Sequence, residues 1–475
     1  MMLSNIDASL SFSFSTLVDA GSVIPSLLAT TSEAEYGSFV LTGVLLTLIV
    51  VYVVSKLGGE LSKRLDLPPV LGELVGGVIV GVSVLHLIVF PETGAVASDS
   101  AMMAVLQRLG NLDAEAIIHI FQSQSEVISV LAELGVIVLL FEIGLESDLR
   151  ELGKVGYQAA IVAVVGVVAP FVLGTVGLVM LFNVPIIPAV FAGAALTATS
   201  IGITSKVLSE LGHLKSTEGQ IIVGAAVIDD VLGIIVLAVV ASLAKTGEVD
   251  LFNVIYLIVS ASAFLIGSIL LGKFFNTSFE AMADKLQTRG ALLIPAFTFA
   301  LVMAFLANII HLEAILGAFA AGLVLDETDK RKELDQQVMP IADILVPIFF
   351  VTVGAKADLS VLNPAVAENR AGLIIAAFLI AIAIIGKVVT GWAVFGQPGV
   401  NRLAIGVGMI PRGEVGLVFA GIGSASGVLD KPLEAAIIVM VILTTFLAPP
   451  FLQLALKGQT KSAPTTDDKP LPAVE

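Results

Sequence analysis

Apolar segments of about 20 residues recur along most of the chain and are separated by short polar stretches. A helix of about this length spans the hydrocarbon core of a bilayer, which is roughly 30 Å thick. The pattern therefore predicts an all-α polytopic membrane protein with about 13 transmembrane helices. The predicted spans are residues 37–57, 68–90, 126–146, 156–182, 186–205, 219–244, 251–272, 290–311, 312–325, 340–355, 371–395, 402–427 and 433–456.

Polar stretches divide the rest of the chain. Residues 1–36 contain no Lys or Arg, so their apolar part lacks the basic start of a secretory signal, and we expect an extracytoplasmic tail. Residues 458–475 are predicted to form a cytoplasmic polar tail. Residues 91–125 are expected to form a hydrophilic outer loop, and the charge run 326–339 a solvated linker.

Some spans carry the signs of discontinuous transporter helices. The span 312–325 is short, and the span 340–355 is interrupted by Pro347 and Gly354. An odd number of helices suits two inverted six-helix repeats, helices 1–6 and 8–13, joined by helix 7. Polar breaks at 197–204 and 409–416 then fall in the fifth helix of each repeat. We therefore expect a discontinuous helix at the same place in both repeats.

The basic residues are distributed unevenly between alternate loops. Of the 24 Lys and Arg residues, 17 fall on one side of the predicted membrane, five on the other and two within spans. Because cytoplasmic loops are enriched in Lys and Arg, this places the N-terminus outside and the C-terminus in the cytoplasm.

Composition excludes several classes of protein. With 57% hydrophobic and 13% charged residues, the chain is no ordinary soluble domain, and its lack of cysteine excludes disulfides and cysteine nucleophiles. A net charge of −16 without a basic patch argues against nucleic-acid binding. No nucleotide fingerprint appears in the C-terminal tail, and the four histidines are too scattered for a metal site. We expect no enzymatic activity, no cofactor and no metal beyond a transported monovalent cation.

Two adjacent carboxylates, Asp229 and Asp230, interrupt the apolar run 221–240. An ionised group at the centre of a bilayer costs at least about 2.5–3.5 kcal/mol, so the pair needs a function or a partner. Neighbouring helix residues point about 100° apart, so one carboxylate can contact another helix while the other faces a cavity. We predict a cation- and proton-binding site, against the alternatives of a purely structural ion pair and of a short, water-exposed loop between two half-spans.

Lys387 lies inside the predicted span 371–395 and is the natural counter-charge for one of these carboxylates. The alternative is that its long side chain reaches the aqueous face of the membrane.

Hydroxyl groups cluster at the first polar break. Thr197, Thr199, Ser200 and Thr204 stand among small residues, and their oxygens suit a hard cation such as Na⁺. The alternative is that they are packing residues, which are common where membrane helices meet. We take Thr199 and Ser200 as the candidate cation ligands.

Further charged residues lie within or near the spans. Arg412 and Glu414 follow Pro411, where a helix must bend or break, and we expect them to stabilise that break and each other's charge. Glu73 and Glu142 lie near the inner ends of helices 2 and 3 and are expected to line a cavity.

Five motifs occur in order along the chain, and together they resemble the monovalent cation:proton antiporter-2 family over residues 37–457. They read L-A-E-L-G-V-I-V-L-L-F-E-I-G-L-E, T-A-T-S-I-G-I-T, A-A-V-I-D-D-V-L-G, P-I-F-F-V-T-V-G and G-M-I-P-R-G-E-V-G-L-V. The chain looks most like bacterial and cyanobacterial Na⁺/H⁺ antiporters. The resemblance implies a homodimer in which each protomer interleaves a dimerisation domain with a six-helix core domain that moves against it. It also implies that the two unwound helices cross.

The resemblance implies roles for single residues. Asp230 matches the ion-binding aspartate of the family. Asp229 matches the position that is Asp in electrogenic members and Asn or Gln in many electroneutral ones. Lys387 falls where electrogenic members place a lysine that pairs with that first aspartate. Potassium-efflux members usually carry a cytosolic nucleotide-sensing domain, and we expect none here.

We therefore predict a secondary antiporter that exchanges cytoplasmic Na⁺, or Li⁺ or K⁺, for external H⁺ by alternating access at the aspartate site. It would function in the lipid bilayer of a prokaryotic inner membrane or thylakoid, in pH homeostasis. Three alternatives stay open: a K⁺/H⁺ exchanger of the same family, a sodium-coupled organic-anion symporter and a cation channel. A symporter would need an anion-binding group, and a channel would carry ions without proton coupling.

Overall fold

The computed structural model describes residues 15–246, 250–283, 285–286, 288–363, 367–397 and 399–457. These residues form α-helices and short 3-10 helices, with no β-strand among them, so the predicted all-α fold is confirmed. The elements are α1 (Ser15–Arg64), α2 (Pro69–Val80), η1 (Pro91–Thr93), η2 (Ala97–Asp99), α3 (Ala101–Gly110), α4 (Ala114–Glu146), α5 (Leu149–Phe182), α6 (Ile186–Ala195), α7 (Ile201–Leu211), α8 (Thr217–Thr246), α9 (Leu251–Ala283), α10 (Leu293–Ile309), α11 (Ala314–Leu325), α12 (Arg331–Ala355), η3 (Leu359–Leu362), α13 (Ala367–Val388), η4 (Val389–Ala393), α14 (Arg402–Gly408), α15 (Glu414–Ala425) and α16 (Lys431–Leu456).

Eight of the described helices are long and apolar enough to cross a membrane: α1 from Gly37 onward, α4, α5, α8, α9, α12 up to Ala355, α13 and α16. The apolar helices α2, α6, α10, α11 and α15 are shorter. Each predicted span contains one helix or a pair of short helices, but α2 fills only the first half of the predicted span 68–90, whose residues 81–90 are not helical. The pairs α6–α7 and α14–α15 occupy the two spans with central polar breaks, as predicted. The chain is a multi-pass membrane protein.

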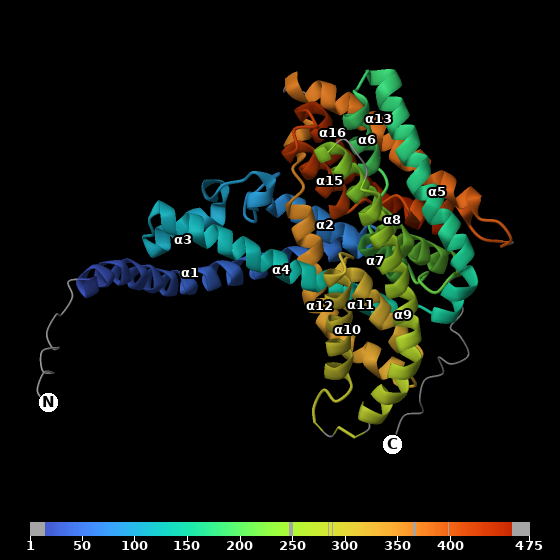
Figure 1. Ribbon diagram of the computed structural model, residues 1–475, viewed down its shortest axis with the longest axis horizontal. Helices are drawn as coiled ribbons and strands as arrows, with labels where there is room; N and C mark the ends of the chain where they lie inside the picture. The colour runs from blue at the N-terminus through green and yellow to red at the C-terminus, as the bar shows by residue number, and fades with distance from the viewer. Residues whose placement is uncertain are drawn as a thin grey trace, which may run out of the picture.

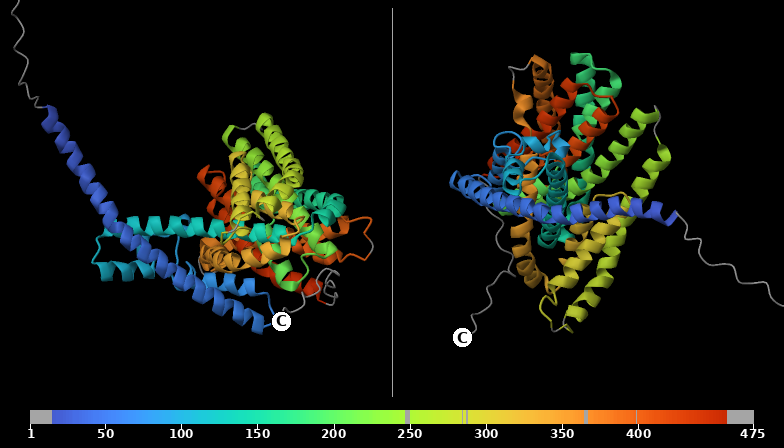
Figure 2. Two further views of the ribbon diagram at one scale, coloured as in Figure 1. Left: turned by 90° about the horizontal axis from the view of Figure 1, so that it is seen from below. Right: turned by 90° about the vertical axis from the view of Figure 1, so that its left-hand side faces the viewer.

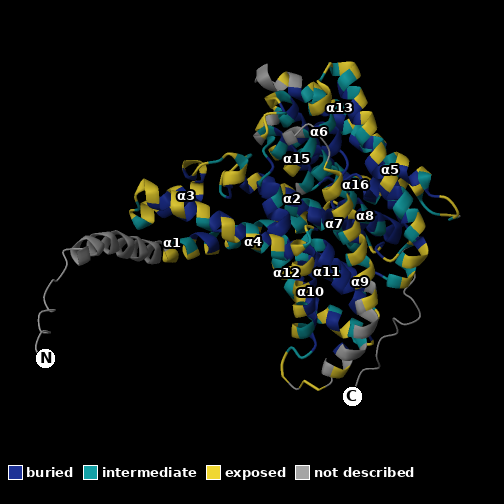
Figure 3. Ribbon diagram, viewed as in Figure 1, coloured by how far each residue is buried: buried dark blue, intermediate teal, exposed yellow. Residues whose placement is uncertain are grey.

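Exposed side chains on the outer helices are largely apolar. The outward faces of α1, α5 and α9 carry residues such as Ile49, Val168 and Ile258, each about half exposed, whereas α7 and α11 are mostly buried (Figure 3). Exposed apolar surface on this scale is what lipid tails cover.

The helices pack as two groups. The panel unit contains α1, α2, α4, α10, α11 and α12, and the core unit contains α5–α8 and α13–α16. In Figure 1 most core helices lie in the upper part and α10–α12 in the lower part, while α1 and α4 extend to one side; Figure 2 shows the same division from two other directions. The chain alternates between the units, with the first and second halves each supplying three panel helices before the core helices. Helix α9 joins the halves.

Close backbone contacts hold the panel unit together. Where α1 crosses α2, Gly58 faces Gly72, and a Cβ on either glycine would collide with the backbone of the other. Small residues allow such close approach between membrane helices, where van der Waals contact is the main source of association.

The connections define two sides of the molecule. On one side, the basic side, the turns 65–68, 147–148 and 326–330 lie close to one another or to the end of α16, as the pairs Arg150–Glu327 and Lys457–Asp66 show. The α3 side is the other side and carries η1, η2 and α3.

Two expectations about connections were wrong. Helix α4 begins at Ala114, inside the expected loop 91–125, because Asp113 caps its first turn and Ile120 is buried with Met103 of α3. A search for long apolar runs does not detect short amphipathic stretches of this kind.

The solvated linker expected over the charge run 326–339 is also shorter than predicted. Helix α12 begins at Arg331 and continues through Pro347, because its buried residues Leu334 and Val338 pack on the panel one turn apart. The predicted interruption of this span is therefore absent from the described helix. A solvated turn is limited to residues 326–330.

Candidate cation site at the crossed helices

Asp229 and Lys387 form an ion pair inside the core unit. Asp229 lies on α8, and Lys387 lies in the last turn of α13, with its Nζ 3.2 Å and 3.4 Å from the two carboxylate oxygens. Neither side chain is exposed. Gly166 of α5 makes room for the ammonium, since a Cβ there would lie 3.2 Å from Nζ. Lys387 therefore contacts a carboxylate and does not extend to water.

Asp230, the next residue of α8, faces a different environment. It is 6% exposed and lines a small pocket between the core and panel units. The two neighbouring carboxylates thus point to different surroundings, in keeping with their angular separation on a helix. The pocket contains oxygen-bearing residues from the break between α6 and α7 and residues of α4, α11, α12 and α15. Its lining is Val136, Ala198, Thr199, Ser200, Ile201, Gly202, Asp230, Glu313, Ile315, Phe349, Gly413 and Val415.

The two discontinuous helices cross beside this pocket. Helix α6 ends at Ala195 and α7 begins at Ile201, while α14 ends at Gly408 and α15 begins at Glu414. The backbone N–H of Ser200 donates to the carbonyl of Pro411 at 2.8 Å, which links the two unwound segments. Unwound backbone at this depth exposes carbonyl oxygens, and these suit a monovalent cation.

The hydroxyl groups of the crossing fall into two sets. Thr199 and Ser200 line the pocket, and the Thr199 hydroxyl also donates to the Met409 carbonyl at 3.2 Å. Thr197 and Thr204 lie outside the lining and donate to the carbonyls of Ala194 and Gly408. A hydroxyl that donates its hydrogen keeps its oxygen lone pairs, so Thr199 can tie the crossing together and still offer an oxygen to a cation.

Arg412 is fully buried at the crossing. Its Nη1 donates to the carbonyls of Ala198, at 3.0 Å, and Met409, at 3.4 Å, so the guanidinium satisfies backbone left open by the break. The Thr445 hydroxyl of α16 donates to the Arg412 carbonyl. Glu414 begins α15, but its side chain lies outside the described part of the chain, so the Arg412–Glu414 pair stays a prediction.

The pocket adjoins a larger cavity on the α3 side. That cavity has a volume of about 280 Å³ and shares Val136, Phe349 and Gly413 with the pocket. At its mouth Lys356 pairs with Glu92 of η1. The geometry gives the pocket a neighbouring cavity toward the α3 side.

A second cavity, of about 640 Å³, lies on the basic side between α7 and the panel helices α1, α2 and α12. It has no lining residue in common with the pocket. Lys206 and Val346 line it, about one helical turn from the pocket residues Gly202 and Phe349. Glu73 also lines this cavity, whereas Glu142 lies half-buried on α4 outside it.

Sequence reasoning missed one carboxylate of the pocket. Glu313 precedes α11 and brings a negative charge from the panel unit to the pocket that holds Asp230. The available signal was an acid at the start of an unusually short apolar span. The described residues contain no cluster of His, Asp or Glu suited to a resident metal ion.

Comparison with known proteins shows the family. The sodium/hydrogen exchanger transmembrane family matches residues 23–458. The chain belongs to this family. It is 61% identical over 444 residues to the high-affinity Na⁺/H⁺ antiporter NhaS3 of Synechocystis, covering 94% of this chain and 96% of that protein. The resemblance to cyanobacterial antiporters is therefore confirmed.

More distant relatives support the same classification. The Na⁺/H⁺-K⁺ antiporter GerN of Bacillus cereus is 33% identical over 413 residues, covering 86% of this chain and 95% of GerN. Among solved structures, the sodium/proton antiporter MjNhaP1 of Methanocaldococcus jannaschii matches with a TM-score of 0.58 and 18% identity, covering 88% of this chain and 99% of MjNhaP1. At this identity the likeness establishes the antiporter fold.

Proposed function

We propose that this protein is a Na⁺/H⁺ antiporter that binds both ions in turn at Asp230. The observation that carries the proposal is the placement of the Asp230 carboxylate, with Thr199 and Ser200, in a pocket at the crossing of two broken helices. Membership of the exchanger family and the name of the relative from Synechocystis support Na⁺ as the cation.

Exchange follows from competition for one carboxylate. A cation favours the charged form of Asp230 and displaces its proton, and a proton neutralises the carboxylate and releases the cation. Hydroxyl and carbonyl oxygens at the crossing replace part of the cation's hydration shell. Because the pocket lies between the core and panel units, a rigid-body movement of the core unit against the panel unit would expose it to each side in turn.

The Asp229–Lys387 pair supplies a second titrating group. If cation binding at Asp230 draws Asp229 away, Lys387 loses its counter-charge and a buried ammonium is no longer favoured. Release of that proton and its return from the other side would give about two protons per cation. The exchange would then be electrogenic.

We further propose the orientation and assembly. The excess of Lys and Arg in the loops assigned to the basic side supports an orientation with that side, and the C-terminus, in the cytoplasm; the membrane would be a prokaryotic inner or thylakoid membrane. The panel unit, with the exposed apolar face of α1, is the proposed dimerisation domain of a homodimer, and the core unit is the mobile domain.

A K⁺/H⁺ exchanger is the second candidate, because the relative GerN is named for K⁺ as well as Na⁺. An organic-anion symporter is less well supported, since two carboxylates, Asp230 and Glu313, line the pocket. A channel would conduct cations without moving protons.

Proteoliposomes with a preset pH gradient test the proposal. Addition of Na⁺ should dissipate the gradient at lower concentrations than addition of Li⁺ or K⁺. Dissipation by K⁺ at the lowest concentration would favour the K⁺/H⁺ exchanger. Cation uptake that leaves the pH gradient unchanged would contradict antiport.

A further inference from the structure

Helix α7 of the core unit is hydrogen-bonded to two panel helices on the basic side. The Ser209 hydroxyl donates to Glu146 Oε2 of α4 at 3.0 Å. The backbone N–H of Val70, in the first turn of α2, donates to Glu210 Oε2 of α7 at 3.4 Å. A carboxylate is favoured at a helix N-terminus, so this contact is electrostatic as well as a hydrogen bond.

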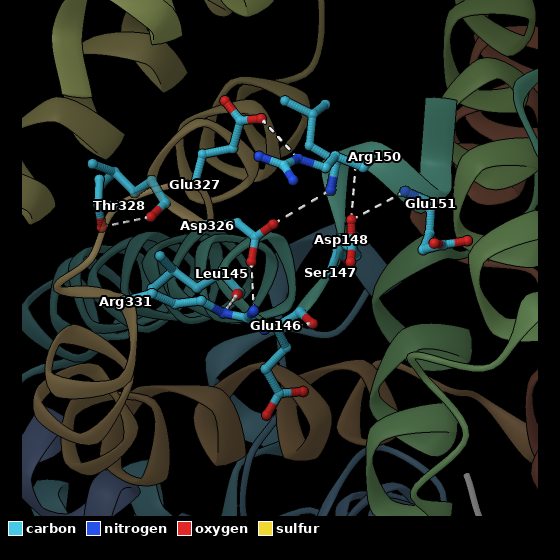
Figure 4. Close-up of polar contacts among 12 residues, drawn as sticks. Leu145, Glu146, Ser147, Asp148, Arg150, Glu151, Asp326, Glu327, Thr328 and Arg331 are labelled. Carbon is cyan, nitrogen blue, oxygen red and sulfur yellow. Dashed lines mark hydrogen bonds and ion pairs between the residues drawn. The ribbon is translucent and has the colours of Figure 1, made fainter. Parts of the chain in front are cut away.

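A second connection joins the panel unit to the first residue of the core helix α5 (Figure 4). Asp326 accepts a hydrogen bond from the Leu149 N–H at 3.3 Å and pairs with Arg331 at 2.8 Å. Arg331 also donates to the carbonyls of Leu145 and Glu146 at the end of α4. The turn between α11 and α12 thus holds the two-residue link through which the chain passes from panel to core.

The Asp326 side chain is largely buried where it contacts Leu149 and Arg331. Asp326 lies between α11 and α12, outside the spanning segments. Burial raises the pKa of its carboxyl to about 6, while the Arg331 charge acts in the opposite direction. A third contact lies nearby, since Gln453 of α16 donates to the Asp66 carbonyl at 2.6 Å.

On the α3 side the two units are separated by the cavity of about 280 Å³ that adjoins the ion pocket. The contacts described above join the units on the basic side, where the cavity of about 640 Å³ shares no lining residue with the pocket. A movement that carried α7 away from the panel helices would have to break the contacts of Ser209 and Glu210, because these contacts join α7 to α4 and α2.

We propose that Ser209, Glu210 and Asp326 form a cytoplasmic latch that holds the core unit against the panel unit while the ion pocket faces the α3 side. They are positioning residues of the transport cycle, and their contacts set the ratio of the two facing states. The proposal rests on the alternating access and the orientation proposed above. Each contact is a hydrogen bond to a carboxylate, which water can replace when the core moves, so opening costs only the net strength of a few bonds.

The natural absence of cysteine makes the latch testable by single-cysteine labelling. Val346→Cys places a thiol on the panel wall of the basic-side cavity, where Val346 is 3% exposed and should become accessible when α7 moves away. Ala132→Cys places a second reporter in the cavity of the α3 side. A membrane-impermeant maleimide is added from the side under test, with the full-length protein in proteoliposomes.

Variants of the latch residues are compared with a control variant that removes a carboxylate from the same cavity. Ser209→Ala with Glu210→Gln should raise the labelling rate of Val346→Cys about tenfold, because the first change removes the bond to Glu146 and the second replaces a charged acceptor of the Val70 N–H by a weaker neutral one, which increases the minor, inward-open state. Labelling of Ala132→Cys should stay within about twofold. Glu60→Gln is the control, since Glu60 lines the same cavity but pairs with Arg64 of its own helix.

Three results would overturn the latch. They are an unchanged Val346→Cys rate, an equal increase in Glu60→Gln, or a parallel increase at both reporters, which would indicate general loosening. If the double variant fails to fold, Asp326→Asn tests the separate contact at α5 with the same expectation. Labelling needs no ion gradient, so failure of Na⁺/H⁺ exchange in the unmutated protein would contradict the proposed function and leave the latch to be judged separately.

Discussion

Two adjacent aspartates of one helix have different surroundings, and this difference underlies the proposed chemistry. Asp229 is fully buried against an ammonium, whereas Asp230 lines a pocket with hydroxyl groups and a neighbouring cavity. A buried carboxylate with a fixed counter-charge is suited to stabilising the fold and to titrating together with its partner. A carboxylate in a pocket that also contains hydroxyl groups is suited to exchange of a cation for a proton.

The hydroxyl of Thr199 is expected to contribute to cation affinity. Thr199→Val removes one oxygen ligand from the pocket and should raise the apparent KM for Na⁺ about three- to tenfold, as expected for loss of one polar contact to a charge. The variant also loses the hydrogen bond to Met409. Initial rates of Na⁺-driven pH change give the KM.

Thr204→Val is the matched control for this prediction. Thr204 ties the same crossing together through Gly408 but does not line the pocket. Its loss should lower thermal stability with little change in KM. Equal effects of the two variants on KM and stability would show that Thr199 is only a packing residue.

The pocket carboxylate from the panel unit is expected to influence cation affinity as well. Glu313→Gln removes an acid that lines the same pocket as Asp230, so the apparent KM for Na⁺ should rise about threefold or more. Glu133→Gln, which removes an acid from the larger cavity outside the pocket, should change KM less. Equal effects of Glu133→Gln and Glu313→Gln on the KM for Na⁺ would show that Glu313 acts only through its general negative charge.

The sequence was informative about charged residues whose insertion into a membrane costs much free energy. It was less informative about residues at the ends of the spans. Asp229, Asp230 and Lys387 stand out because charges within apolar runs must find partners. Glu313 was missed because it is the second residue of the predicted span 312–325, at a span end where hydropathy does not distinguish a water-facing acid from one that faces a pocket. The four hydroxyls could not be divided into pocket and packing sets, since that depends on the angle at which the two broken helices cross.

At the scale of elements, the long apolar helices and the two helix breaks were predictable. Hydrophobic length determines the spans, and clustered polar or Pro/Gly residues mark the breaks. The starts of α4 and α12 were misplaced because the first turns of both helices carry polar and charged residues beside buried apolar ones. Pro347 proved compatible with a continuous helix, so a proline alone is a weak indicator of a broken span.

The contact between α8 and α13 is expected to make transport electrogenic. Lys387→Gln removes the second titrating group, so the steady current that follows a Na⁺ jump on a solid-supported membrane should fall to near zero while some Na⁺/H⁺ exchange persists. Unmutated protein should show robust charge movement under the same conditions.

Breaking one member of a buried ion pair can cost about 3–5 kcal/mol, so this variant needs a folding control. The double variant Asp229→Asn/Lys387→Gln leaves no uncompensated charge and should recover protein yield without recovering the current. Electroneutral transport by the unmutated protein would dispose of the proton-carrying role of Lys387.

At the scale of the whole molecule, two helix groups packed around one pocket provide the framework for alternating access. The chain crosses between the panel and core units through short links, and the pocket lies where the units meet. This division was implied by family resemblance and could not be obtained from hydropathy, because helices of both units are equally apolar.

The central claim is that Asp230 is the shared site for the cation and the proton, and Asp230→Asn tests it most directly. The substitution removes the titrating charge and nearly preserves the side-chain volume. In proteoliposomes the folded variant should show no Na⁺-driven dissipation of a pH gradient, while its size-exclusion profile matches that of the unmutated protein. Na⁺-driven proton release by Asp230→Asn at a rate near that of the unmutated protein would contradict the account.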